Sequence, residues 1–149
     1  MTYMVNKNTF YSNGKLLITG EYLVLNGAKA LALPTKFGQS LTVDSLTSSE
    51  GLEEKGILWK SIDNKNNIWF EVNFNEALEI ISTTDNEIAA TLKNILEHCK
   101  LRTQNSKLIT KLDFPQNWGL GSSSTLISCL LYTSPSPRDR TRSRMPSSA

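Results

Sequence analysis

The sequence has few of the residues that build disulfide frameworks and histidine metal sites. Its 149 residues include two cysteines, Cys99 and Cys129, and one histidine, His98. Two cysteines give no disulfide framework, and a single histidine has no partners at the spacing of a zinc site or a catalytic pair. We therefore expect a reducing, cytoplasmic location and a solvent-facing His98. We expect Cys99 in the core because it lies on the apolar face of a predicted helix.

Long hydrophobic runs are also missing. No run approaches the roughly 20 apolar residues that cross a bilayer, and residues 1–10 lack the basic flank and apolar segment of a secretory signal. We expect no membrane partner. The hydrophobic fraction of 39% and the charged fraction of 20% are ordinary for a soluble globular protein, and the length suits about one domain.

Positive charge is concentrated at one end of the chain. The formal net charge is +2, but without residues 132–149 it would be −1. That segment holds one acid, Asp139, and four arginines, Arg138, Arg140, Arg142 and Arg144. The body of the chain therefore lacks the basic patch of a nucleic-acid-binding protein, and we expect no nucleic-acid partner.

The first half of the chain reads mostly as strands. KLLITG (15–20) predicts a short buried strand, and EYLVLNG (21–27) follows it up to an Asn-Gly turn signal. Further strand segments are predicted at 28–34, ending at a proline, and at 39–46. Residues 56–62 and 67–74 flank the polar stretch DNKN and predict a hairpin, in which we expect Trp59 and Trp69 to pack rather than stack on a ligand.

Helical spacing comes later. Residues 85–101 predict a helix because apolar side chains recur on one face, and Thr84 with Glu87 fits a capping box. A strand at 106–114 and a helix beginning at Ser122 follow. Several strands, a helix, a strand and a helix start indicate an α+β fold.

A glycine-serine turn lies between that last strand and helix. Glycines at 119 and 121 let the backbone approach a ligand, and the first amides of a helix have no internal partner and carry partial positive charge. Ser122, Ser123 and Ser124 add hydroxyls for capping, for phosphate or for magnesium. Gly119–Ser124 therefore reads as a phosphate cradle, although a plain glycine turn before a serine-capped helix fits the spacing about as well. It is not a Walker A loop.

Two stretches together resemble the GHMP kinases, the family of galactokinase, homoserine kinase and mevalonate kinase. SNGKLLITGEYLVLNGAKALALP (12–34) is similar to the family's first motif, and GLGSSST (119–125), after Pro115, is similar to its second. The order and separation of the two stretches also match. The resemblance is closest to the mevalonate-kinase-like branch and, within it, to the GYDIA subfamily, which shares the GEYLVL and ALALPTKFGQSL stretches.

The resemblance implies an incomplete fold like domain 2 of ribosomal protein S5 and an ATP- and Mg²⁺-dependent kinase. Such an enzyme transfers the γ-phosphoryl group to a hydroxyl or phosphate of a small metabolite. Lys15 would lie near the acceptor, and Glu21 would orient the first motif and contact Lys15. The loop would wrap the ATP phosphates, with Ser123 as the magnesium ligand; its residues are Gly119, Leu120, Gly121, Ser122, Ser123 and Ser124.

The chain departs from the family's pattern in two ways. Small residues usually precede the second motif, whereas this chain has Asn117 and Trp118; we expect Trp118 to plug the loop against the core rather than line the nucleotide site. The branch also supplies a catalytic aspartate and a third glycine-rich motif downstream, and neither is found here. We therefore expect an inactive N-terminal fragment whose partner is the missing C-terminal domain of its own parent. The alternative is a non-enzymatic module that binds a nucleotide or phosphate.

The end of the chain has a different composition. CLLYTSPSPRD (129–139) and SRMPSSA (143–149) resemble translated sequencing-adapter text, so we divide the chain into a truncated kinase domain at 1–128 and a non-native, disordered tail at 129–149. The alternatives are a native basic arm that binds RNA or an acidic surface, and a solvated tail without a role.

Overall fold

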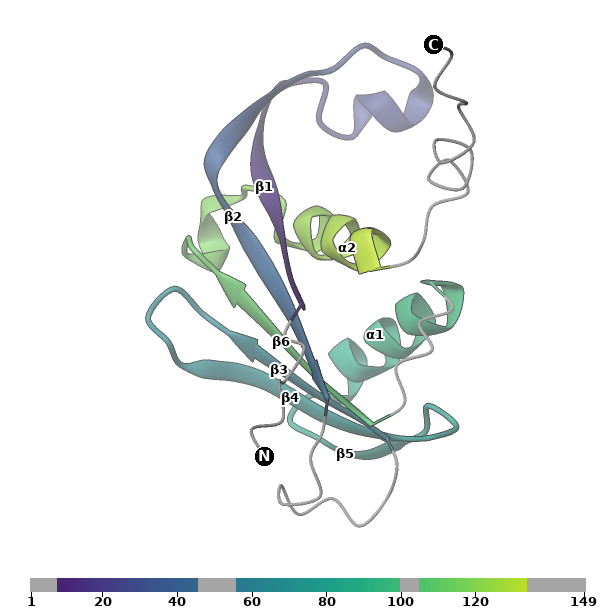
Figure 1. The fold of residues 1–149 in the computed structure, drawn as a ribbon. Helices are drawn as coiled ribbons and strands as arrows, with labels where there is room; N and C mark the ends of the chain where they lie inside the picture. Colours follow the sequence, from purple (N-terminus) through teal and green to yellow (C-terminus); the bar gives the residue numbers. More distant parts are fainter. Residues whose placement is uncertain (1–7, 46–55, 100–104, 134–149) are drawn as a thin grey trace, which may run out of the picture.

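The chain forms a mixed sheet with helices packed on one face (Figure 1). This computed structural model describes residues 8–45, 56–99 and 105–133. The strands lie in the order β1-β2-β6-β3-β4-β5, and β3 and β6 are parallel while the other neighbours are antiparallel. The elements are β1 (Asn8–Thr19), η1 (Leu23–Asn26), β2 (Leu31–Ser45), β3 (Gly56–Ile62), β4 (Ile68–Asn75), β5 (Ile80–Thr83), α1 (Asn86–Cys99), β6 (Ser106–Leu112), η2 (Gln116–Trp118) and α2 (Ser122–Thr133), where η marks a 3-10 helix. The predicted α+β class is confirmed.

The core lies between the sheet and the two α-helices. Trp59 of β3 pairs with Val72 of β4 and Leu108 of β6, and all three side chains are buried at 1% exposure or less. Leu96 of α1 and Leu130 of α2 close the other side of this layer. Alternation of apolar and polar residues along β3, β4 and β6 puts one face of each strand into this core, so the predicted hairpin and its packed Trp59 are confirmed.

The β1–β2 pair extends beyond the rest of the sheet. β2 pairs with β1 over most of its length, but it pairs with β6 only from Gln39 to Ser45. Residues 15–34, which comprise the end of β1, η1 and the start of β2, form what we call the arm. Its apolar side chains are largely exposed, Leu16 at 44% and Leu25 at 83%. KLLITG is therefore part of a strand, as predicted, but the prediction that this strand is buried is wrong.

Three boundaries in this half differ from the prediction. β1 begins at Asn8 rather than residue 15, and residues 23–26 form η1 instead of a strand. The segments at 28–34 and 39–46 join into one strand through Pro34. Proline lacks an amide donor, but β2 has only β1 as a neighbour at this point, so the missing hydrogen bond costs the sheet little.

Asp85, not Thr84, caps α1. The Asp85 carboxylate oxygen Oδ1 accepts hydrogen bonds from the amides of Glu87 (2.9 Å) and Ile88 (3.1 Å). The Thr84 hydroxyl instead accepts a hydrogen bond from the Glu71 amide of β4 (3.1 Å). The predicted capping box is therefore wrong, because Thr84 still belongs to the sheet side of the turn and the helix begins one residue later.

Cys99 and His98 lie as predicted. Cys99 is partly buried against the core, and His98 is exposed, with its Nδ1 3.1 Å from the Asn94 carbonyl oxygen. α2 continues to Thr133, and Cys129 on it is buried. The predicted limit at residue 128 stays a prediction, and residues 134–149 lie outside the described residues. Within the described ranges, no helix is long and apolar enough to cross a membrane.

Candidate functional site

The glycine-serine turn bends twice through the left-handed region. Gly119 has φ 68° and ends η2, and Gly121 has φ 74° and directly precedes α2. Side chains are disfavoured at such angles, so glycine is the residue expected at both positions. Between them Leu120 is 8% exposed and packs with Leu112 and Phe114, which anchors the turn to the end of β6.

The first turn of α2 leaves its backbone donors open. The Thr125 amide donates to the Gly121 carbonyl oxygen (3.0 Å), which makes Gly121 the residue that precedes the helix. Glycine has no side chain to cap the helix. The amides of Ser122, Ser123 and Ser124 accordingly make no hydrogen bond to any other residue in the described part of the chain. Three amides and the positive end of a 12-residue helix dipole therefore face the same region.

Lys15 lies against this turn. Its amide donates to the Leu120 carbonyl oxygen (3.0 Å), so the backbones of the two sequence motifs are hydrogen-bonded. A Cβ placed on Gly121 would lie 3.7 Å from both Cγ and Cε of Lys15 and 3.3 Å from Oγ of Ser124. The lysine side chain thus runs alongside the mouth of α2, and the space beside Gly121 is small enough that a methyl group would crowd it.

Glu21 is separate from this cluster. It lies in the exposed turn between β1 and η1, and no ion pair joins it to Lys15 in the part of the chain that the structure describes. Thr19 is four positions along the strand from Lys15, about 13 Å at the usual rise, and Glu21 lies beyond it. The expected contact between Lys15 and Glu21 is absent, and a catalytic role for Glu21 stays a prediction.

Trp118 does not plug the core. Its side chain is 54% exposed and forms a T-shaped pair with Phe37, with the ring centroids 5.8 Å apart. Lys36 lies over the Phe37 ring, with its Nζ 5.5 Å from the ring centroid. The core-plug prediction is wrong because Leu120 fills the position beneath the turn and leaves the indole on the surface.

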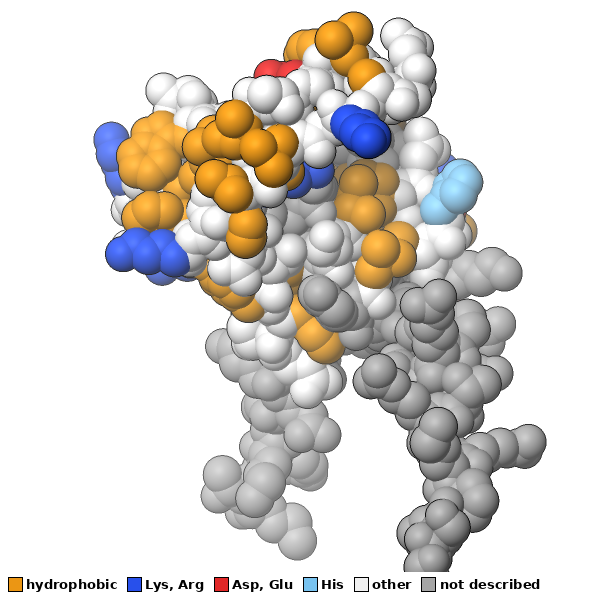
Figure 2. Space-filling model, turned by 90° about the horizontal axis from the view of Figure 1, so that it is seen from above, with side chains coloured by type: hydrophobic (Ala, Val, Ile, Leu, Met, Phe, Trp, Pro, Cys, Tyr) orange, Lys and Arg blue, Asp and Glu red, His pale blue; other side chains and the backbone are white. Residues whose placement is uncertain are grey.

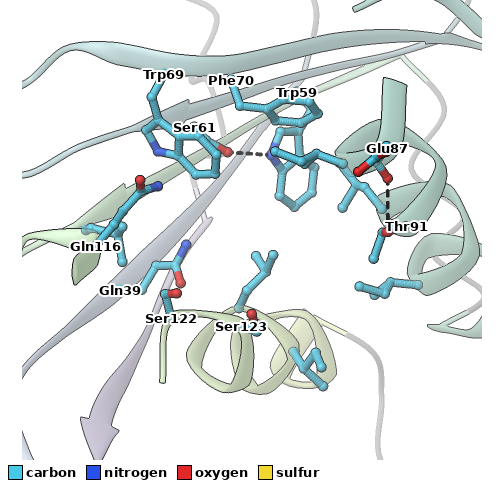
Figure 3. Close-up of a pocket in the computed structure, with 16 residues that line it drawn as sticks. Gln39, Trp59, Ser61, Trp69, Phe70, Glu87, Thr91, Gln116, Ser122 and Ser123 are labelled. Atoms are coloured by element: carbon cyan, nitrogen blue, oxygen red, sulfur yellow. Dashed lines mark hydrogen bonds between the residues drawn. The ribbon is translucent and has the colours of Figure 1, made fainter. Parts of the chain in front are cut away.

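A cavity of about 520 Å³ opens beside the first turn of α2 (Figure 3). The sheet contributes the aromatic side chains Trp59, Trp69 and Phe70, α1 contributes Ile88 and Leu92, and α2 contributes Ser122 and Ser123. Trp69 is 39% exposed, so part of this wall is open to solvent. The cavity is large enough for a small organic ligand, and it meets the predicted phosphate cradle at the two serines.

Two buried polar side chains face this cavity, and neither belongs to the two sequence motifs. Gln39 is 4% exposed, and its Oε1 lies 2.8 Å from the Thr125 hydroxyl, which leaves its Nε2 toward the cavity (Figure 3). Ser61 is 5% exposed, and its Oγ accepts from Trp59 Nε1 (3.0 Å) and Thr110 Oγ1 (2.9 Å). A signal for Gln39 existed, because it alternates with the apolar residues Phe37 and Leu41 on the face of β2 that the core uses.

No protein family matches the sequence, and no curated protein is similar to it in sequence. Among solved structures, it superposes on a mevalonate kinase (TM-score 0.59, 16% identity), covering 89% of this chain and 43% of that one. The Methanococcus jannaschii mevalonate kinase gives a TM-score of 0.58 at 17% identity, with 91% and 43% covered. The Lactococcus lactis galactokinase complexed with galactose gives 0.59 at 20% identity, with 89% and 34% covered.

These likenesses concern the fold. The chain spans less than half the length of each of these three structures. Its six-stranded mixed sheet and two helices correspond to their N-terminal part. The chain therefore has the fold of the N-terminal half of the GHMP kinases.

Proposed function

We propose that this chain binds a nucleoside triphosphate with magnesium, as the nucleotide-binding part of a small-molecule phosphotransferase of the mevalonate kinase type. The observation that carries the proposal is the mouth of α2, where the unpaired amides of Ser122, Ser123 and Ser124 lie beside Lys15. Hydrogen-bond donors and positive charge lie together there, so the site suits an anion that has several oxygen acceptors. The cavity beside the serines would take the base, because aromatic walls suit a flat heterocycle.

The residues present fit a triphosphate in a specific way. The absence of a side chain at Gly121 leaves room for phosphate oxygens to reach the backbone, which a Cβ 3.3 Å from Ser124 Oγ would fill. Magnesium keeps water and phosphate oxygens as most of its ligands, so a single hydroxyl suffices from the protein, and exposed Ser123 at the cavity rim is our candidate. When bound, the ion would neutralise charge on the triphosphate.

Lys15 would serve phosphoryl transfer by position and charge. Its ammonium group would hold the transferring phosphoryl group or the acceptor hydroxyl, because transfer of this kind depends mainly on alignment and charge neutralisation. The acceptor, a hydroxyl or phosphate of a small metabolite, would approach from the side of the first motif. The rest of a longer chain would cover the arm and complete the acceptor site; this chain alone would bind nucleotide without turnover.

Binding to the isolated chain tests the proposal. We expect the wild-type protein to bind ATP with magnesium, and we expect Lys15→Met to weaken this affinity by about tenfold or more, since a hydrogen bond to a charged group is worth about 1.5–3 kcal/mol. Lys29→Met removes the same charge from the exposed turn after η1 and should bind as the wild type does. Titration calorimetry measures both. Equal weakening by the two substitutions would mean that only net charge matters and would contradict a site at Lys15.

A turnover assay separates the enzyme from the binding module. A longer parent chain should form ADP at a rate that rises with one small alcohol or phosphate. Nucleotide binding by that parent with no ADP formation under any such acceptor would support the non-enzymatic module instead.

A further inference from the structure

The side chain of Gln39 is a buried amide, and the fold does not require an amide at this position. Its neighbours on the core face of β2 are apolar, yet its side chain is 4% exposed and lines the cavity. The Thr125 hydroxyl lies 2.8 Å from Gln39 Oε1 and 2.7 Å from the Ser122 carbonyl oxygen, so it binds the carboxamide to the first turn of α2. Nε2, the other end of the carboxamide, has no hydrogen bond to a described residue and points into the cavity (Figure 3).

An amide donor that faces a cavity without a protein partner is bonded there by water or by a ligand, whereas an apolar residue of the same size would need neither. Methionine has nearly the same length and would fill the position without a polar group. Thr125 would lose nothing essential by that change, because its hydroxyl still has the Ser122 carbonyl as an acceptor. The packing of the fold therefore does not explain Gln39, and its free donors call for an acceptor inside the cavity.

Ser61 supplies a second donor on the sheet side of the cavity, which Gln39 also lines. Its oxygen accepts from Trp59 and Thr110, and its own proton has no acceptor among the described residues. β6 lies between β2 and β3, so Gln39 and Ser61 are two strands apart on one face of the sheet, about 9.5 Å in the hydrogen-bonding direction. A nucleoside is long enough to present acceptor atoms near both.

We propose that Gln39 is a nucleoside-binding residue, which donates from Nε2 to an acceptor atom of the base or ribose, and that Thr125 is the positioning residue that holds it. This inference rests on the proposed nucleotide site and adds to it the residue that recognises the nucleoside. In Figure 3, Ser61 lies beside Trp59 and Trp69, and Gln39 lies beside Ser122 at the first turn of α2. We assign Gln39 to the part of the nucleoside next to the phosphates, and the comparison of adenosine with tripolyphosphate tests that it does not bind the phosphates themselves.

The test measures three probes on the full 149-residue chain: ATP with magnesium, adenosine, and inorganic tripolyphosphate. We expect Gln39→Met to weaken ATP and adenosine binding by about tenfold, the value of one buried hydrogen bond, and to leave tripolyphosphate unchanged. Gln39→Glu, which offers acceptors in place of donors, should weaken adenosine at least as much. Unchanged adenosine binding by either variant, or equal weakening of tripolyphosphate, overturns the inference.

Thr125 provides an independent pair of variants. Thr125→Ser keeps the hydroxyl and should retain adenosine affinity, whereas Thr125→Val keeps the shape, loses the hydroxyl and should weaken adenosine but not tripolyphosphate. Loss of adenosine binding by both variants alike would mean that Thr125 acts by packing, and overturns its positioning role. Thermal unfolding confirms that each variant is folded before binding is compared. If the wild type binds none of the three probes, the proposed function itself fails; if it binds tripolyphosphate but not adenosine, the phosphate site stands and only this inference fails.

Discussion

The two ends of this sheet use apolar residues in opposite ways. Along β3, β4 and β6, alternate side chains disappear into a core with the helices, and Trp59, Phe70 and Leu108 are nearly inaccessible. In the arm the apolar content is as high, yet Tyr22, at 78% exposure, and Leu25 remain in contact with solvent. Figure 2, which looks down on the end where the arm lies in Figure 1, shows hydrophobic side chains gathered at the surface. Hydrophobic sequence alone therefore does not establish burial; a strand is buried only where another element covers its face.

This contrast predicts where stability resides, and Trp59→Ala should show the largest effect. The substitution removes a buried indole and its hydrogen bond to Ser61, so unfolding should become easier by about 3–5 kcal/mol. Leu25→Ala in η1 deletes an exposed side chain and should change stability by no more than about 0.5 kcal/mol. Urea unfolding of the two variants measures the comparison, and similar losses would mean that the arm is packed in solution.

Within the arm, backbone geometry should matter more than side-chain burial. A Cβ on Gly20 would lie 2.7 Å from the Lys29 carbonyl oxygen and 2.8 Å from Cα of Ala30, and φ is 84°. We expect Gly20→Ala to destabilise the arm by about 2–4 kcal/mol. Gly27 has nearly the same φ, 85°, with nothing nearby, so Gly27→Ala should cost only about 1–2 kcal/mol.

Amide hydrogen exchange can locate these losses. Both glycine substitutions should accelerate exchange in residues 15–34 and leave the amides of β3 and β4 unchanged. Faster exchange throughout the sheet would show that the arm and the core unfold as one unit, against the distinction drawn above.

In the packed part of the molecule, removing the cap of α1 should lower stability less than the substitution of Trp59 does. Asp85→Ala removes the acceptor for two helix amides and should cost about 1 kcal/mol, whereas Asp85→Ser should restore most of the loss because serine is an equally good cap. Thermal unfolding of the two variants measures the difference. If Asp85→Ala were as stable as the wild type, Thr84 rather than Asp85 would be the residue that caps α1.

The smallest effect should come from pH, where the β1 strand meets the end of β6. Tyr11 donates to Asp113 (2.7 Å), and burial followed by this bond raises the pKa of the phenol from 10.0 to about 12. The folded state therefore favours the neutral phenol. Its contribution to stability is complete below pH 10 and is lost as the pH rises toward 12. Tyr11 is 42% exposed, so water screens the interaction and the loss should be modest.

Tyr11→Phe provides the control for that titration. The difference in absorbance at 295 nm between wild type and variant should show one phenol ionising near pH 12. Ionisation near pH 10 would mean that Tyr11 and Asp113 are not bonded in solution.

The sequence allowed the local features to be predicted. Alternation of apolar and polar residues predicted the β3–β4 hairpin, and helical spacing predicted α1 to within two residues of each end. The glycine-serine turn predicted that α2 begins at Ser122. The continuous β2 was missed because proline normally interrupts a sheet, and the free edge beside Pro34 is a property of the pairing, which no local pattern contains.

Of the candidate site, only the two motifs that form one side of it could be predicted from the sequence. The two motifs identify Lys15 and the loop, and the structure brings them together through the bond from the Lys15 amide to Leu120. The cavity depends on side chains from β2, β3, α1 and α2, which are distant in sequence, so it could not be read from any one stretch. Gln39 stands out in the sequence as a polar residue in an apolar alternation. Its partner Thr125 is 86 positions away, so the sequence pattern did not show that the two side chains meet.

β2 belongs to both regions of the molecule. One uninterrupted run of 15 residues begins among the exposed leucines and passes Gln39 before it reaches the middle of the sheet. The exposed arm and the wall of the cavity therefore share one continuous strand.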